Sequence, residues 1–221
     1  MSAPIKPMAK KVLLVEGNDE RDLCSLLINK KLGLKCISSQ NIETFIKDND
    51  TVHIIPLNEV DNKSNITSFM KSPNYNEIEK LGIVIDAENN AQKRFNIFND
   101  IIKLEYNPNQ NIYYDDNKGL FLTTKTNDKT SGCLECLVED IILEKDKDLY
   151  NECVNKFFDC ANNYINQGNN EYHILKSKIL AFISVKCNKR NSIGGLFQDC
   201  NDYLDSKVLY DIIVFLKNLF N

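Results

Sequence analysis

The amino-acid sequence predicts an α/β protein in which a parallel sheet is flanked by helices and followed by a helical C-terminal part. Two observations lead to this prediction. Short apolar runs alternate with segments of helical periodicity as far as residue 130, which is typical of parallel strands joined by helices. From residue 131 onward, helical periodicity continues alone. We therefore expect an α/β core over residues 1–130 and a helical part packed on it over residues 131–221.

The first part of the chain is expected to begin with a buried strand at residues 11–15, which are mostly apolar and lie just before Gly17 and Asn18. Asp19 is suited to cap the helix that follows, and Gly33 ends that helix. The next elements expected are a strand at 34–38, a helix at 41–48 with apolar residues at 42, 45 and 46, and a strand at 52–57.

The strongest strand prediction in the middle of the chain is the apolar run at residues 81–86. The polar segment before it, residues 58–80, is expected to hold one or two helical turns. A helix is expected at 90–104, followed by strands at 111–114 and 120–123 that form an edge hairpin turning at 116–119.

The C-terminal part is expected to consist of helices separated by glycine-containing breaks. Breaks are expected at Gly168 and at Gly194-Gly195. The expected helices cover residues 131–144, 148–166, 171–186 and 206–219.

The composition is that of a soluble globular protein, with 43% hydrophobic and 26% charged residues. The 27 basic and 31 acidic residues give a net charge of −4, which argues against a strongly basic nucleic-acid clamp and leaves a local basic face open. No apolar run approaches the ~18–20 residues needed to span a bilayer, and the N-terminal residues lack the apolar stretch of a secretory signal. We therefore expect a cytoplasmic protein with no membrane partner.

The eight cysteines include one CxxC motif, Cys133-Leu-Glu-Cys136. A four-ligand zinc site needs a second pair or nearby histidines, and His53 and His173 are isolated in the sequence. Because apolar residues flank the motif at helical spacing, we favour small packing cysteines on a helix over metal or redox chemistry.

Acidic residues follow two of the predicted strands. Glu16 comes directly after the first strand, and Asp86 and Glu88 end the strand at 81–86. The carboxyl ends of parallel strands meet at one edge of the sheet, where ligands usually bind. Carboxylates gathered there repel one another unless a cation neutralises them, and hard oxygen ligands favour Mg²⁺ or Mn²⁺. Each feature alone is equally compatible with a helix cap and a solvated first turn.

Together these residues resemble the Toprim family, whose domain occurs in DnaG-type primases, topoisomerases, a small ribonuclease that matures ribosomal RNA, and OLD-family nucleases. Glu16-Gly17 matches the first family motif, an apolar strand ending in Glu-Gly. Asp86-Ala87-Glu88 matches the second, Asp-x-Asp, with Glu88 in place of the second Asp. Glu20 falls where OLD-type members often carry a further acid, and an i, i+4 pair with Glu16 would share one helix face.

The resemblance extends to small stand-alone Toprim-like proteins of unknown function. Gly132-Cys133-Leu134-Glu135 is similar to their Gly-x-Leu-Glu segment, and the resemblance makes Glu135 a candidate ligand for a second metal. An exposed first-turn glutamate is the equal alternative for Glu135. A phosphate site also needs a cation, for which Lys125 and Lys129 are the candidates, although solvated loop lysines are the commoner case.

The resemblance implies Mg²⁺- or Mn²⁺-dependent phosphoryl transfer on DNA or RNA, with nuclease as the favoured reaction. Asp86 and Glu88 would be metal ligands, and Glu16 a ligand or a general acid/base. The main alternative is a non-catalytic Toprim-like protein that binds nucleic acid or nucleotide. A second alternative is another Mg²⁺ protein on a doubly wound sheet, such as a phosphohydrolase or receiver domain. Because many OLD-type modules work beside an ATPase and this chain has no Gly-x-x-x-x-Gly-Lys-Ser/Thr motif, a separate ATPase is a candidate partner.

Overall fold

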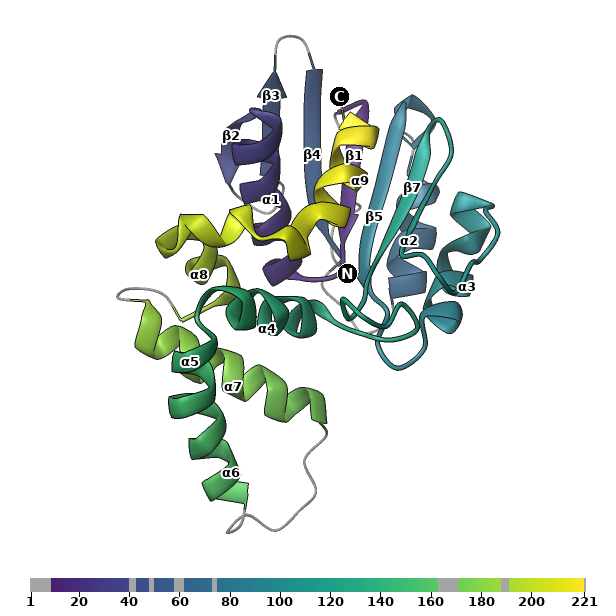
Figure 1. Ribbon diagram of the computed structural model, residues 1–221. Helices are drawn as coiled ribbons and strands as arrows, with labels where there is room; N and C mark the ends of the chain where they lie inside the picture. The colour runs from purple at the N-terminus through teal and green to yellow at the C-terminus, as the bar shows by residue number, and fades with distance from the viewer. Residues whose placement is uncertain are drawn as a thin grey trace.

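The computed structural model describes residues 9–39, 43–47, 50–57, 62–72, 75–162, 171–187 and 191–220. Over these residues it is a mixed α/β fold, with helices on both faces of one sheet and a helical C-terminal part (Figure 1). The strands are β1 (Lys11–Val15), β2 (Lys35–Ser39), β3 (Glu43–Lys47), β4 (Asp50–Pro56), β5 (Lys80–Asp86), β6 (Ile112–Tyr114) and β7 (Lys118–Thr123).

The helices fall into two groups along the chain. Those within the α/β part are α1 (Asn18–Leu32), α2 (Asn62–Met70), the 3₁₀ turn η1 (Tyr75–Glu77) and α3 (Ala91–Ile102). Those of the C-terminal part are α4 (Leu134–Lys145), α5 (Lys147–Leu149), the π-helical segment η2 (Tyr150–Asn155), α6 (Lys156–Asn162), α7 (Glu171–Lys186), α8 (Ile193–Asp199), the 3₁₀ segments η3 (Asn201–Asp205) and η4 (Lys207–Leu209), and α9 (Tyr210–Phe220).

The described strands form a seven-stranded sheet in the order β2-β3-β4-β1-β5-β7-β6. Its four central strands, β4, β1, β5 and β7, are parallel, and Leu13 at the centre lies opposite Ile54 on one side and Gly82 on the other. β2, β3 and β6 run antiparallel to their neighbours at the two edges. The predicted parallel centre is therefore confirmed, as is the predicted edge hairpin, which β6 and β7 form.

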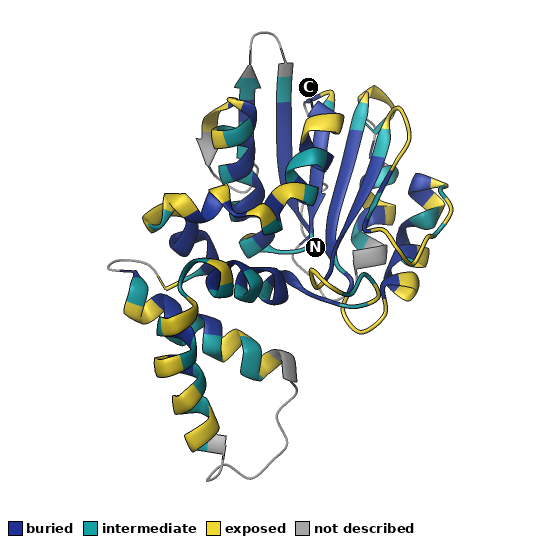
Figure 2. Ribbon diagram, in the orientation of Figure 1, coloured by how far each residue is buried: buried dark blue, intermediate teal, exposed yellow. Residues whose placement is uncertain are grey.

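The strand sequences place apolar residues on both faces of the sheet, because side chains alternate along a strand. On β1, Val12 and Leu14 pack in a core with α2 and α3, whereas Leu13 and Val15 pack in the core on the other face, which α1 and α9 cover. Figure 2 shows these central strands buried and the outer sides of the helices exposed. Burial on both faces explains why these strands are continuously apolar.

The last helix belongs to the same core as the sheet. Phe215 of α9 packs on Phe121 of β7, with ring centroids 5.7 Å apart. The backbone approaches closely here: a Cβ on Gly82 would lie 2.8 Å from Leu219, and one on Gly119 would lie 2.8 Å from Phe215. The helical C-terminal part therefore packs on the α/β part through glycine positions in two adjacent strands. The division of the chain at residue 130 stays a prediction.

Two sequence predictions about secondary structure are wrong. Residues 43–47, which were predicted to be helical, form β3, with Phe45 buried and paired to Val52 of β4. A segment this short gains more from pairing with the open edge of β4 than from an isolated helical turn. Gly194-Gly195 does not separate two helices but lies inside α8. Ser192 caps this helix by accepting a hydrogen bond from Gly195 N at 3.1 Å. Gly194 is needed there because a Cβ would meet the side chain of Asp22 on α1.

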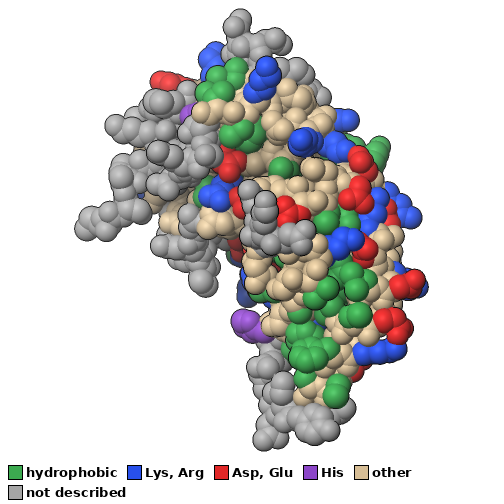
Figure 3. Space-filling view, turned by 90° about the vertical axis from the view of Figure 1, so that its left-hand side faces the viewer, with side chains coloured by type: hydrophobic (Ala, Val, Ile, Leu, Met, Phe, Trp, Pro, Cys, Tyr) green, Lys and Arg blue, Asp and Glu red, His purple; other side chains and the backbone are tan. Residues whose placement is uncertain are grey.

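Helices α5 to α7 extend away from the sheet (Figure 1). The predicted helix at 148–166 is interrupted by the π-helical segment η2, whose buried Tyr150 donates a hydrogen bond to Glu139 of α4 at 2.7 Å. Residues 163–166 of that prediction, and Gly168, lie outside the described residues. Figure 3 shows hydrophobic side chains on the surface of this lower part. Phe157 of α6 is one of the exposed large hydrophobic residues of the protein. Among the described helices, none combines the length and hydropathy needed to cross a bilayer.

Candidate functional site

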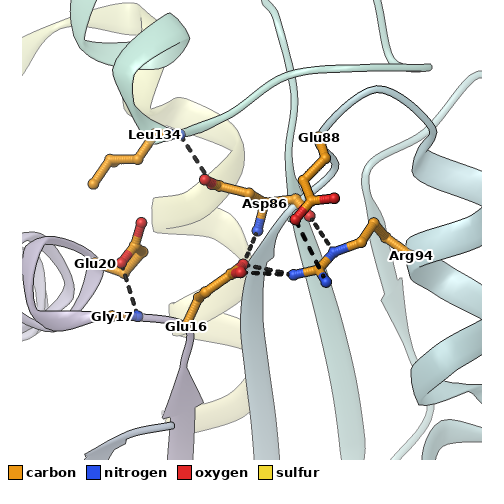
Figure 4. Close-up of polar contacts among 7 residues, drawn as sticks. All are labelled: Glu16, Gly17, Glu20, Asp86, Glu88, Arg94 and Leu134. Atoms are coloured by element: carbon orange, nitrogen blue, oxygen red, sulfur yellow. Dashed lines mark hydrogen bonds and ion pairs between the residues drawn. The ribbon is translucent and has the colours of Figure 1, made fainter. Parts of the chain in front are cut away.

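Glu16 and Asp86 lie next to each other at the carboxyl edge of the sheet (Figure 4). Asp86 is the last residue of β5, and Glu16 follows β1 directly, so the pairing of these two parallel strands brings them together. The Glu16 carboxylate accepts a hydrogen bond from the backbone N–H of Asp86, at 2.9 Å. The two residues that define the predicted site are therefore neighbours in the fold.

Arg94, in the first turns of α3, connects three of the groups at this edge. One guanidinium nitrogen donates to both oxygens of Glu16, at 2.8 Å each. Its Nε donates to the carbonyl oxygen of Asp86 at 3.0 Å, and another nitrogen lies 3.7 Å from the Glu88 carboxylate. Arg94 is only 8% exposed, so these interactions form in a partly desolvated environment where charge-assisted hydrogen bonds are strong.

Glu20 lies in the first turn of α1 and is buried beside the same edge. Its carboxylate accepts a hydrogen bond from the N–H of Gly17 at 2.9 Å, so it helps to cap the helix. The predicted i, i+4 relationship with Glu16 is wrong in its geometry, because α1 begins at Asn18 and Glu16 precedes it. Glu20 is buried close to the other acidic residues, but it does not share a helix face with Glu16.

The other two candidate ligands lie at the rim of the site. Glu88 has a positive φ of 52°, and its side chain is 57% exposed and turned toward Arg94. The Glu88 carbonyl accepts a hydrogen bond from the N–H of Gly132 at 2.8 Å, which joins the β5 end to the start of α4. Glu135, in the first turn of α4, forms an ion pair with Lys176 of α7 at 3.0 Å.

The carboxylate of Asp86 accepts a hydrogen bond from the backbone N–H of Leu134 at 2.9 Å. Its pKa is nevertheless raised well above the usual value, first by burial and then by the negative charges of Glu20, Glu16 and Glu135. The pKa of Glu20 is raised to about 7, again by burial first and then by nearby carboxylates. The site therefore concentrates more negative charge than its surroundings readily stabilise.

A hollow of about 330 Å³ opens on this cluster, and its lining includes Asp86, Glu88, Glu135, His173 and Lys176. The donor set is chemically suited to Mg²⁺ or Mn²⁺, because every acid supplies hard carboxylate oxygens. Within the described residues, however, no three Asp, Glu, His or Cys side chains lie together in an arrangement that could hold a metal ion. The acids are instead directed toward protein donors, as with Glu16 and Arg94.

The two lysines proposed as phosphate ligands lie elsewhere. Lys125 borders a separate hollow of about 560 Å³, together with Lys178 and Asp140. Lys129 forms an ion pair with Asp211 of α9 at 3.1 Å and borders a third hollow. Lys176 of α7, which was not predicted from the sequence, lines the hollow that contains Asp86.

A family model described as "Protein of unknown function (DUF3226)" matches residues 10–221, which is nearly the whole chain. The chain belongs to the DUF3226 family. The DUF3226 chain is also similar in fold to a crystal structure of hypothetical protein PH0156 from Pyrococcus horikoshii OT3. That match has a TM-score of 0.50 and 14% sequence identity, and covers 95% of this chain and 97% of the other. No curated protein matches this chain.

Sequence reasoning missed Arg94 and Lys176. A weak signal existed for Arg94: the chain has three arginines among 27 basic residues, and one lies on the helix after the Asp86 strand. Such a helix begins beside the carboxyl edge of the sheet, where a buried guanidinium can bridge carboxylates. Lys176 carries no comparable signal in this DUF3226 sequence, since only the packing of α7 on α4 brings it to Glu135.

Proposed function

We propose that this DUF3226 protein binds Mg²⁺ or Mn²⁺ at the acidic hollow and hydrolyses phosphodiester bonds in nucleic acid, as a Toprim-type nuclease. The observation that carries the proposal is that Glu16, Glu20 and Asp86 come from separate elements to the carboxyl edge of a largely parallel sheet (Figure 4), with Glu135 near enough for its charge to raise the pKa of Asp86. That edge is where ligands bind in α/β proteins. Metal binding would draw these acids closer together than they are in the described residues.

The charge of the cluster supports a cation ligand. Asp86 is partly buried and lies close to three other carboxylates, whose charges raise its pKa. Arg94 and Lys176 are basic side chains that pair with Glu16 and Glu135. A divalent cation would neutralise the excess and allow these acids to ionise together at neutral pH. A bound Mg²⁺ or Mn²⁺ would orient a water molecule and stabilise charge on the transferring phosphate.

The residues divide into roles by position. Asp86, at the end of β5, and Glu20, which is 8% exposed, are the proposed ligands together with Glu16, once Glu16 exchanges Arg94 for the cation. Glu16 can alternatively accept or donate a proton, as its Toprim counterpart does by resemblance. Lys176, at the rim of the same hollow, replaces Lys125 and Lys129 as the proposed cation for the phosphate.

Glu88 is the main departure from the Toprim pattern. It replaces the second Asp of the motif, and its exposed side chain is turned toward Arg94. We propose that Glu88 contributes to the metal site from its outer side and is the least important of the acids.

The alternative function is binding of nucleic acid or nucleotide without catalysis. The observation that favours it is the contact of both Glu16 oxygens with Arg94, because an acid held in this way is not free to act as a base or a ligand. On this hypothesis, Arg94 stabilises the sheet edge permanently and the acids have a structural role.

Calorimetric titration with Mn²⁺ tests the cation. We expect binding by the full chain, and loss of most of it in Glu16→Gln and in Asp86→Asn. Glu152→Gln is the matched control, because Glu152 is an exposed acid on η2 outside the hollow. Binding that is the same in all four proteins would show that the acidic hollow is not the cation site.

Cleavage is tested separately, with supercoiled plasmid and with a single-stranded RNA in the presence of Mn²⁺ or Mg²⁺. We expect cleavage of at least one substrate by the wild-type chain and by Glu152→Gln, but not by Asp86→Asn. If the cation binds at the acids and neither substrate is cleaved, the non-catalytic alternative is supported. Cleavage that persists in both Glu16→Gln and Asp86→Asn would exclude this site as its source.

A further inference from the structure

Two cysteine sulfurs meet at the start of α4. Cys133 is the N-cap residue, with extended backbone, and Cys136 lies three residues later in the first turn. Their Sγ atoms are 3.0 Å apart, in a contact in which either thiol can donate. Because a disulfide bond is about 2.05 Å long, closing one here requires an approach of only about 1 Å.

Both thiols are buried, with 6% of each residue exposed, yet each borders open volume. Cys133 lines the acidic hollow of about 330 Å³, and Cys136 lines the neighbouring hollow of about 560 Å³. A packing role explains the burial of the two cysteines. It does not explain why their sulfurs touch each other and reach two hollows that a small molecule can enter.

We propose that Cys133 and Cys136 are a reversible redox pair that is oxidised by a low-molecular-weight disulfide entering through the larger hollow. The Cys136 thiolate attacks one sulfur of the incoming disulfide, which breaks its S–S bond and releases one small thiol. The Cys133 thiol then loses its proton and attacks the Cys136 sulfur, which forms the Cys133–Cys136 disulfide and releases the second small thiol. Two protein thiols are oxidised, and one small disulfide is reduced to two thiols.

The position of this pair connects it to the acidic cluster. Leu134, between the two cysteines, donates its backbone N–H to Asp86 at 2.9 Å, and Glu135 lines the same hollow. A disulfide would therefore form within the helical turn whose backbone donates a hydrogen bond to Asp86. The redox pair itself rests on the sulfur geometry and does not depend on the proposed nuclease activity.

Peptide mapping of the wild-type chain tests the proposal. The protein is equilibrated with mixtures of oxidised and reduced glutathione, quenched in acid, alkylated and digested with trypsin. The tryptic peptide 130–145 contains Cys133 and Cys136, no other cysteine and no internal Lys or Arg. We expect this peptide to become lighter by two hydrogen atoms as the mixture becomes more oxidising, to resist alkylation, and to regain two alkylatable thiols after reduction.

The exposed Cys153, in tryptic peptide 148–156, reports whether the oxidant reacts with accessible thiols in the same sample. In a Cys133→Ser variant, peptide 130–145 should instead carry a glutathione adduct on Cys136. The proposal is overturned if wild-type peptide 130–145 keeps two alkylatable thiols, or carries only glutathione adducts, at a ratio that modifies Cys153. Because the decisive measurement uses the unmodified chain, a variant that fails to fold does not weaken the test.

Discussion

A single guanidinium nitrogen of Arg94 donates to both carboxylate oxygens of Glu16, at 2.8 Å each. The two residues are 78 positions apart in the chain, and β1 and α3 bring them together at the carboxyl edge of the sheet. Arg94 also binds the backbone of Asp86, so this one side chain fixes the geometry of the two acids on which the proposed site depends.

Arg94→Met is expected to lower the free energy of unfolding by about 1–3 kcal/mol, because it leaves the partly buried Glu16 carboxylate without its main charge partner. Urea denaturation measures the change. Lys93→Met, on an exposed neighbour in α3, is the matched control and should have little effect. The double variant Glu16→Gln with Arg94→Met should lose less than the sum of the single variants, and strict additivity would contradict this account.

Stability is expected to fall as pH rises from about 4.5 to about 7, because the pKa of Glu20 is raised to about 7 from its ordinary 4.5. A carboxyl group with a higher pKa in the folded state binds more protons there than in the unfolded chain, so raising the pH favours unfolding until both states are ionised. The raised pKa of Asp86 acts in the same direction. For Glu20 the loss of stability is at most about 3–4 kcal/mol.

Urea midpoints measured between pH 5 and pH 8 test this prediction. Glu20→Gln should show a shallower decline than the wild-type chain, since glutamine does not titrate. Glu77→Gln, on an exposed acid of η1, should follow the wild type. If stability falls with pH as steeply in Glu20→Gln as in the wild type, the pKa of Glu20 is not raised in the folded protein.

Lys176→Gln is expected to strengthen Mn²⁺ binding by roughly two- to tenfold, because it removes a positive charge from the rim of the acidic hollow. Its ion pair with Glu135 is half-exposed, so unfolding stability should change by less than about 1 kcal/mol. Calorimetric titration compares it with Lys178→Gln, a lysine on the same helix that borders the other hollow. Mn²⁺ binding that is the same in Lys176→Gln and Lys178→Gln would place the cation away from Lys176.

Phe215→Ala is expected to destabilise the protein by about 3–5 kcal/mol, because Phe215 is fully buried between α9 and the sheet. Lys217→Ala, on the exposed side of the same helix, should stay within about 0.5 kcal/mol of the wild type. Thermal denaturation followed by circular dichroism separates the two. Similar melting temperatures for both variants would mean that α9 is not part of the cooperative core.

The sequence by itself determined the central strands and the position of the acids at their ends. The apolar runs of β1 and β5 are buried on both faces, so their composition identifies them without knowledge of their neighbours. Because parallel strands end at one edge, Glu16 and Asp86 could be expected to meet. The edge hairpin of β6 and β7 followed from two short strand patterns around a turn.

Tertiary structure alone decided which partners these acids have. Residues 43–47 are a strand because β4 offers an open edge, a long-range pairing that local periodicity does not contain. The same holds for Arg94, which reaches Glu16 from α3, and for Lys176, which reaches Glu135 from α7. Sequence patterns record the local preferences of the backbone and the need to bury apolar surface. The choice of charge partner depends on distances that exist only after the helices pack.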